Sequence, residues 1–532
     1  MRPRETRAFL GVWMVLALCC AAPGENNDSP PAVRFAKSSP AATQPAAPDA
    51  QQRKAILADL DAYARKGMKD WKVPGMAVAI VQGDEIVYAQ AFGLKQVGTS
   101  DPVNTHTVFQ IGSTTKAFSA ALVAMQVDAG KVKWDDRVID HLPDFRMQDP
   151  WVTREFRVVD LMAQRSGMPA YAGDAQALLG FPREHIIHSI RLIKPVSSFR
   201  SQFAYVNNLW LVAGQLAAKY EEKPWEQCVI DRIFKPLGMS ESSVDAESFR
   251  KAKNVTTTHV LRDGKVVAIP NDSPTIDWSY VYGPAGAINS NVLDMTRWLR
   301  LQMHDGAFEG KQLISPGSLR FMHSPKTATS ALDPMQYYCQ GWIYRENCPY
   351  PILWHNGGTL GCKTMVAFVP EAKIGIVVLS NLISELPESL AYRFFDRFFG
   401  NEPKDYSAEA LKKRAEQQKK AKGQAPKPPA SPAPPLPLED YAGQYANEMY
   451  GTLHVAPQGD GLLVTLGPRK VELTLKPFHR DTFEIQPSLF DDAPHWAEFR
   501  IGPDGKATEL TLGNFNDDGC GVFTRAAKTP TP

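Results

Sequence analysis

The sequence has little net charge, few cysteines and no apolar stretch long enough to cross a bilayer. Lys and Arg number 59 against 57 Asp and Glu in 532 residues, so the formal net charge is +2. Balanced charge argues against nucleic acid or an anionic membrane surface as the main partner, because both bind strongly basic proteins. The seven cysteines form no CxxC pair and no cluster with histidine. We therefore expect neither a structural metal nor another cofactor.

The amino-terminal segment has the pattern of an export signal. Three arginines precede an apolar run over residues 8–22 that ends in small side chains. This run is shorter than the roughly 20 residues of a membrane span and suits a signal peptide. We expect residues 1–24 to be a signal peptide and the protein to be secreted or periplasmic. A lipoprotein anchor is the weaker alternative, because a bulky Leu in Leu16-Ala17-Leu18-Cys19 stands where a small residue is usual.

An exported protein can oxidise its cysteines. Cys339 and Cys348 flank a predicted β-hairpin, so they are the preferred candidates for a disulfide. The alternative is that all five cysteines after the signal segment are buried thiols.

Composition and periodicity divide the rest of the chain into four parts. Residues 25–50 are rich in Pro, Ala, Ser and Asn and are predicted to be a disordered lead-in. Residues 51–400 alternate from helix to strands, to a long helical stretch, and back to strands and a helix. This order is typical of an α+β domain whose sheet is completed by both ends of the chain. Residues 401–437 form a charged and Pro-rich linker, and 438–532 predict a small antiparallel β-barrel or sandwich.

The first motif with chemical meaning is Ser113-Thr114-Thr115-Lys116, which follows Gly112 and precedes an apolar helical run. An i, i+3 spacing places Ser113 and Lys116 on one face of a helix. The helix start favours developing negative charge, and a desolvated lysine amine can take the proton of a serine hydroxyl. Ser248-Phe249-Arg250-Lys251 has the same spacing, but no glycine precedes it and no apolar helix follows it. We therefore predict that this second copy of the motif lies on the protein surface and has no catalytic role.

The second motif is Tyr205-Val206-Asn207, directly before another apolar helical run. A phenol near a lysine ammonium can act as a general base. Asn207 can hydrogen-bond both Lys116 and a substrate carbonyl. The same spacing in Tyr445-Ala446-Asn447 lies in the C-terminal module and is interpreted as chance.

The third motif is His355-Asn356-Gly357-Gly358, before a predicted strand. Glycines let a substrate backbone approach a strand edge closely. The backbone N–H groups of Ser113 and Gly358 are the candidate oxyanion donors. By itself, His355 is equally well explained as a core histidine.

Together, the three motifs resemble those of class C β-lactamases, serine D,D-peptidases of the penicillin-binding group and related esterases. The resemblance covers roughly residues 51–400, and the C-terminal module is similar to the lipocalin-like module of some members. It implies a β-lactamase/transpeptidase-like fold, with an antiparallel sheet flanked by helices and an all-helical region. The third motif departs from the β-lactamase pattern, which usually has Lys at the position of His355 and Thr or Ser at that of Asn356. Neutral histidine offers no permanent charge to a substrate carboxylate.

The resemblance implies hydrolysis through a covalent acyl-enzyme on Ser113, with Lys116 and Tyr205 relaying protons. The expected partner is a small-molecule or peptide substrate whose amide bond is cleaved: a D-amino-acid peptide, a peptidoglycan stem or a β-lactam. A peptidoglycan substrate would associate the protein with the cell wall. A carboxylesterase with the same Ser/Lys/Tyr site is the first alternative, which His355 favours. A non-catalytic penicillin-binding sensor is the second. Neither a metal nor a defined oligomer is indicated.

Overall fold

The computed structural model describes residues 48–330, 335–347, 349–424, 427–486, 495–516 and 518–526. The predicted signal peptide and nearly all of the predicted lead-in lie outside these residues. No helix within the described part is long and apolar enough to cross a membrane. Cys339 is a buried free thiol whose Sγ lies 3.2 Å from the carbonyl oxygen of His323. Cys348, its predicted disulfide partner, lies outside the described residues.

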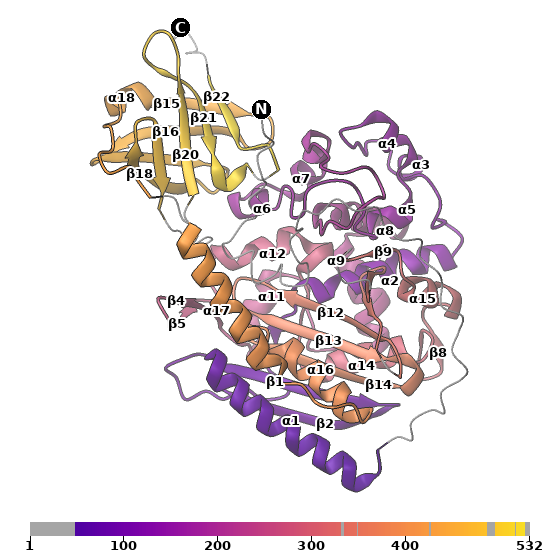
Figure 1. Cartoon of the computed structure of the whole chain (residues 1–532). Helices are drawn as coiled ribbons and strands as arrows, with labels where there is room; N and C mark the ends of the chain where they lie inside the picture. The colour runs from indigo at the N-terminus through magenta and orange to yellow at the C-terminus, as the bar shows by residue number, and fades with distance from the viewer. Residues whose placement is uncertain are drawn as a thin grey trace, which may run out of the picture.

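An eight-stranded antiparallel sheet forms the middle layer of the larger domain (Figure 1). Its strand order is β2-β1-β14-β13-β12-β11-β10-β9, so the first hairpin pairs with the last strand of the domain. Both ends of this stretch therefore complete one sheet, which confirms the predicted α+β fold. The strands are β1 (Gly75–Gln82), β2 (Glu85–Gly93), β9 (Thr327–Ala328), β10 (Gln336–Tyr338), β11 (Ile343–Arg345), β12 (Ile352–Gly358), β13 (Lys363–Val369) and β14 (Ile374–Ser380).

The two faces of the sheet carry different helices. On one face, α1 and α16 pack on each other, and Glu388 of α16 accepts a hydrogen bond from Asn356 of β12. On the other face, α14 packs against β1 and β14, and Trp298 of α14 stacks on Phe118 of α2. Side chains alternate between the faces along a strand, so neighbouring residues of β12 meet different surroundings. The helices are α1 (Ala50–Trp71), α2 (Thr115–Asp128), α14 (Val292–Met303) and α16 (Leu386–Phe398).

Helix α2 lies at the centre of the helical region. Its residues from Thr115 to Gln126 are all buried, as expected for a helix that is apolar on every side. It packs against α8 (Asn208–Glu221), and Phe118 of α2 stacks on Trp298 with ring centroids 3.9 Å apart. The first two motifs lie at the starts of α2 and α8, so the packing of these helices brings the motifs together.

The buried carboxylate of Asp160 holds the segment before Tyr205 in place through two arginines. The fully buried side chain of Asp160 accepts hydrogen bonds from Arg165 Nε at 2.9 Å and Arg200 Nη2 at 2.5 Å. Removing one partner of a buried ion pair leaves charge without compensation. We therefore expect Asp160→Asn to lower the free energy of unfolding by about 3 kcal/mol. Urea denaturation followed by tryptophan fluorescence measures this loss.

Asp61 provides the matched control for this stability prediction. It pairs with Arg65 at 2.8 Å on a partly exposed face of α1, and its other oxygen lies 3.4 Å from the hydroxyl of Tyr88, a contact that an asparagine oxygen can keep. Such i, i+4 pairs contribute about 0.3–0.5 kcal/mol, so Asp61→Asn is expected to leave the urea midpoint almost unchanged. Equal destabilisation in the two variants would contradict the role assigned to Asp160.

The C-terminal domain is a closed antiparallel barrel, as the resemblance implied (Figure 1). Aromatic side chains such as Tyr445, Phe483 and Phe523 fill its interior. Its strands are β15 (Gly443–Asn447), β16 (Gly451–Gln458), β17 (Gly461–Leu466), β18 (Val471–His479), β19 (Thr482–Ile485), β20 (His495–Ile501), β21 (Ala507–Leu512) and β22 (Val522–Arg525).

A long helix, α17 (Tyr406–Gln424), occupies the charged half of the predicted linker and runs from α16 toward the barrel (Figure 1). Its first turn is fixed to α1, because Trp71 Nε1 donates a hydrogen bond to Ser407 Oγ at 2.9 Å. Arg414 lies over the ring of Trp71 one to two turns later. The helix therefore packs on the larger domain over its first half.

Candidate active site

Ser113 lies in a short helical turn between a strand and a buried helix. β3 (Phe109–Gln110) leads into a 3₁₀ turn over Gly112–Thr114, and α2 follows directly. Gly112 has a φ of +53°, and a Cβ there would lie 2.7 Å from the backbone of Gly358. A glycine is required at this position, because other residues rarely adopt this backbone conformation and the side chain would collide. The close approach brings Ser113 next to the end of β12.

Lys116 is fully buried, and its Nζ has three polar neighbours. It lies 3.0 Å from Ser113 Oγ, 2.7 Å from Asn207 Oδ1 and 3.0 Å from the carbonyl oxygen of Ala285. A neutral amine has two N–H donors and one lone pair. The amide and carbonyl oxygens take the two donors, which leaves the lone pair for the hydroxyl of Ser113.

The surroundings of Lys116 also favour its neutral form. Burial lowers the pKa of Lys116 from its usual value to about 7, and the charge of Asp174 opposes this shift. A large fraction of the amine is therefore unprotonated near neutral pH. Lys116 is thus suited to take the proton of Ser113.

Tyr205 and Asn207 lie at the start of α8, as their sequence context predicted. The Tyr205 ring centroid is 4.8 Å from Lys116 Nζ, close enough for a cation–π contact when the amine is charged. Asn207 donates from Nδ2 to Asp174 Oδ2 at 2.6 Å and accepts from Lys116 through Oδ1. Its side chain therefore links the amine to a second buried group.

Asp174 is the part of the site that the motifs did not indicate. It is buried, and burial raises the pKa of its carboxyl from the usual value to about 7. A carboxylate can only accept hydrogen bonds, so it holds the NH₂ end of the Asn207 amide and turns the oxygen toward Lys116. Asp174 has no recognisable spacing from Ser113 or Tyr205. The sequence shows only an aspartate in a loop segment, and its burial next to Asn207 is seen in the structure alone.

The two glycines of the third motif have different surroundings. A Cβ on Gly357 would lie 1.9 Å from the carbonyl oxygen of Ile111, so this glycine lets β12 pack against the segment before Ser113. Gly358 lines the same pocket as Ser113. Its predicted role as an oxyanion donor is compatible with this position and stays a prediction.

His355 and Asn356 lie outside the pocket lining. The His355 side chain is buried, and burial together with the charges of Lys116 and Lys363 lowers its pKa to about 3. Its Nδ1 lies 2.6 Å from the Asn356 carbonyl oxygen, and its Nε2 lies 3.1 Å from the hydroxyl of Tyr338. Asn356 reaches Glu388 on the opposite face of the sheet. The structure therefore gives both side chains partners within the protein.

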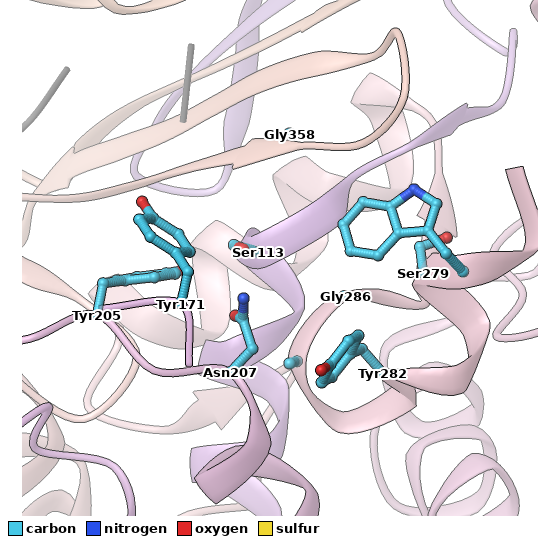
Figure 2. Close-up of a pocket in the computed structure, with 10 residues that line it drawn as sticks. Ser113, Tyr171, Tyr205, Asn207, Ser279, Tyr282, Gly286 and Gly358 are labelled. Atoms are coloured by element: carbon cyan, nitrogen blue, oxygen red, sulfur yellow. The ribbon is translucent and has the colours of Figure 1, made fainter. Parts of the chain in front are cut away.

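The pocket beside Ser113 has aromatic walls (Figure 2). Tyr171 and Tyr205 lie on one side of Ser113, and Tyr282 lies on the other (Figure 2). The pocket contains about 350 Å³ of free space, part of it open to solvent. The lining residues are Ser113, Tyr171, Tyr205, Asn207, Trp278, Ser279, Tyr282, Ala285, Gly286 and Gly358.

The chance copies of the motifs lie elsewhere. Ser248 is exposed in the short helix α11 (Ala246–Lys251), where its Oγ donates to Asp245 Oδ2 at 2.7 Å. Tyr445 is buried inside the barrel, and its hydroxyl donates to the carbonyl oxygen of Tyr441. Among the described residues, no group of three His, Cys, Asp or Glu side chains could hold a metal ion.

Comparison with known families assigns both domains. The Beta-lactamase family model matches residues 60–394. A second model, a domain of unknown function called DUF3471, matches residues 427–520.

Several curated proteins are similar to this chain. An unguisins hydrolase of Aspergillus campestris is 27% identical over 475 residues, which are 84% of this chain and 87% of that protein. An unguisins hydrolase of Aspergillus violaceofuscus is also 27% identical, over 76% of this chain and 77% of its own length. Penicillin-binding protein 4 of Amycolatopsis lactamdurans is 28% identical over 58% of this chain and 81% of its own.

Two solved structures share the fold. The octameric penicillin-binding protein homologue from Pyrococcus abyssi superposes with a TM-score of 0.59 at 21% identity, covering 86% of this chain and 98% of that one. The crystal structure of SurE gives a TM-score of 0.54 at 18% identity, covering 89% and 100%. With the family match spanning more than half of the sequence and Ser113 set against a buried lysine, the chain belongs to the beta-lactamase family of serine hydrolases.

Proposed function

We propose that this serine hydrolase cleaves an amide bond in a peptide, and that an apolar or aromatic side chain of the substrate lies against the aromatic wall beside Ser113. The observation that carries the proposal is the contact of Ser113 Oγ with the buried amine of Lys116 at 3.0 Å. An amine with a pKa of about 7 can activate the hydroxyl without a separate histidine base.

The proposed reaction has two acyl-transfer steps. Lys116 takes the Ser113 proton while Oγ bonds to the substrate carbonyl carbon, and the N–H groups of Ser113 and Gly358 stabilise the oxyanion. The C–N bond then breaks, and the leaving amine receives a proton from Lys116 through Tyr205. A water molecule next attacks the acyl-enzyme ester, releases the acid and returns the proton to Ser113. The Tyr205 ring centroid lies 4.8 Å from Lys116 Nζ, and the relay requires the hydroxyl of this tyrosine to exchange a proton with the amine.

The charges around the pocket favour a substrate without a free carboxylate at the scissile bond. No Lys or Arg is among the ten lining residues. His355 is buried and neutral. Lys363 is 2% exposed and pairs with Glu388 at 2.7 Å, so it is engaged on the other face of the sheet. The tyrosines of the wall offer apolar surface and hydroxyl groups instead. A peptide with a blocked or internal bond fits these surroundings better than one that ends in a carboxylate.

The relatives support acyl transfer in general. Two are named as hydrolases of unguisins and one as a penicillin-binding protein. A carboxylesterase remains the second candidate function, because a neutral His355 and an aromatic wall would also accept an uncharged ester.

Matched substrates test the proposal. We expect an N-acetylated tripeptide with an aromatic residue on the acyl side and a C-terminal amide to be cleaved. Its kcat/KM should be at least about tenfold above that of the same peptide with a free C-terminal carboxylate. The carboxylate would lose its hydrating water at the site without gaining a cationic partner. Release of the amine is followed by mass spectrometry for peptides with L- and D-residues.

The other outcomes assign the alternatives. Preference for the free carboxylate overturns the proposed substrate class. Turnover of a p-nitrophenyl ester without any amide cleavage assigns the carboxylesterase. Labelling of Ser113 by a fluorescent penicillin, with no turnover of peptide, ester or β-lactam, assigns the non-catalytic sensor.

A further inference from the structure

The C-terminal barrel lies beside helix α6 (Ala175–Leu179) of the helical region (Figure 1). Its contacts there involve α6 and α7 (Arg183–Ser189), which follow the Asp174 loop. The contacts are Gln176 Nε2 to the Met449 carbonyl oxygen (3.0 Å), His185 Nε2 to the same oxygen (3.1 Å), the Arg469 N–H to the Leu179 carbonyl oxygen (3.0 Å), and the ion pair of Arg191 with Glu448 (2.7 Å).

One contact of the barrel leads directly to the catalytic lysine. Asp518, in the turn before β22, accepts a hydrogen bond from the backbone N–H of Gly173 at 3.1 Å. The next residue, Asp174, accepts from Asn207 at 2.6 Å, and Asn207 in turn accepts from Lys116 at 2.7 Å. Three hydrogen bonds and one peptide link therefore connect the barrel to the amine beside Ser113.

The loop over residues 171–174 is held from both sides. Its first residue, Tyr171, has a φ of +60° and donates its N–H to the carbonyl oxygen of Tyr205 at 2.7 Å. Gly173 has a φ of +78°, and its carbonyl oxygen accepts from the hydroxyl of Tyr282 at 3.2 Å. Positive φ values are costly for residues with side chains. The conformation of Tyr171, which lines the pocket, therefore depends on the contacts around it.

Asp518 uses its two oxygens for two different parts of the chain. Oδ2 accepts from Gly173 in the larger domain, and Oδ1 accepts from the backbone N–H of Cys520 at 2.9 Å within its own turn. The side chain thus ties the barrel turn to the loop that carries Asp174. An asparagine at this position has a single oxygen and can accept from one of these donors through it.

We propose that the barrel is a structural part of the active site, in which Asp518 positions the 171–174 loop and Asp174, through Asn207, positions Lys116. Both aspartates are positioning residues, since neither touches the reacting atoms. The inference rests on the proposed function insofar as Ser113 and Lys116 form the acylating pair. The barrel then acts on the chemistry through Asp518 and the 171–174 loop, in addition to packing against α6 and α7.

The electrostatics give this positioning role a measurable signature. The negative charge of Asp518 helps to raise the pKa of Asp174, and the charge of Asp174 raises that of Lys116. Without the Asp518 carboxylate, Asp174 ionises at lower pH and holds the proton on Lys116 to higher pH. The acid limb of the acylation rate should therefore move to higher pH. The titratable groups around the two aspartates are Lys116 and Tyr282 beside Asp174, and Cys520 beside Asp518. Tyr450 acts in turn on Tyr282, and Lys194 acts on Cys520.

The experiment measures the rate at which a fluorophosphonate labels Ser113 in the full-length protein between pH 5 and 9. We expect Asp518→Ala to lower the second-order rate constant roughly ten- to hundredfold, because small misplacements of catalytic groups have effects of this size. Asp518→Asn should cause a smaller loss. In both variants the acid limb should lie at higher pH than in the wild type.

Glu448→Gln is the matched control. It weakens another contact of the same interface, the ion pair with Arg191, and does not touch the 171–174 loop. We expect its labelling rate to stay within twofold of the wild type and its acid limb to be unchanged. Wild-type rates and pH dependence in Asp518→Ala, or an equal loss in Glu448→Gln, would overturn the inference. Absence of labelling in the wild type would instead contradict the proposed function.

Discussion

Replacing Ser113 with alanine is expected to abolish covalent labelling and to lower kcat by about 10⁶-fold, as in other serine hydrolases that lose their nucleophile. The reason is geometric. Ser113 Oγ lies 3.0 Å from Lys116 Nζ, so its hydroxyl can give its proton to the lone pair of the neutral amine. Ser113 also lines the same pocket as Gly358. Without it, no acyl-enzyme can form at this position. Intact-protein mass spectrometry after incubation with a fluorophosphonate, together with amide turnover, measures both losses.

The chain contains its own control for this experiment. Ser248 has the same spacing to a lysine, but it is exposed and its hydroxyl donates to Asp245. Lys251 pairs with Glu247 on the surface and remains protonated. Ser248→Ala should therefore label and turn over like the wild type. Residual labelling of Ser113→Ala at one mole per mole, or loss of labelling in Ser248→Ala, would show that the nucleophile has been assigned to the wrong serine.

The contrast between these two serines shows what local sequence predicts well. A Ser-x-x-Lys string fixes only that the two side chains share a helix face. Gly112 and the apolar run after Lys116 contain the additional information, because they require a tight turn and a helix buried on all sides. The same reasoning predicted that Tyr205 and Asn207 lie at the start of a buried helix. It also predicted the sheet that both ends of the domain complete, since strands and helices alternate in the required order.

The parts of the site that sequence did not predict depend on contacts between distant segments. Asp174 lies in a loop without regular periodicity, and its role follows from the meeting of that loop with Asn207 at the start of α8. The orientation of His355 depends on which face of β12 meets the pocket. The strand register that decides this is set by β13, where His355 lies opposite Val366. A single residue of shift would exchange the two faces.

The place of the barrel could not be predicted for a related reason. The Pro-rich composition of residues 401–437 indicates a spacer but not where the spacer leads. In the structure, part of that segment is α17, packed on α1 through Trp71 and Ser407. The barrel then meets α6 and α7 rather than lying apart from them. Contacts such as Asp518 with Gly173 join residues 345 positions apart, and no short motif encodes them.

The second large effect is expected at Lys116. In Lys116→Met the hydroxyl of Ser113 loses its base, and kcat/KM should fall by about 10²- to 10⁴-fold. In the wild type, the neutral amine is the active form, and its pKa is lowered to about 7. The rate of acylation should therefore increase with pH, about tenfold per unit well below pH 7, and level off above it. A pH profile of kcat/KM on an amide substrate measures the midpoint of this rise.

Lys116→Arg separates the base from the positive charge. A guanidinium with a pKa above 12 keeps its proton throughout the assay range, and so it can provide charge to the pocket but no lone pair. If Lys116 acts as a base, the arginine variant should be about as inactive as the methionine variant, and the rise near pH 7 should disappear from its profile. If instead the lysine only supplies positive charge beside Tyr205, the arginine variant keeps most of the activity. Thermal unfolding of both variants checks that the buried position tolerates each side chain, so that a loss of activity reports the missing lone pair and not a missing fold.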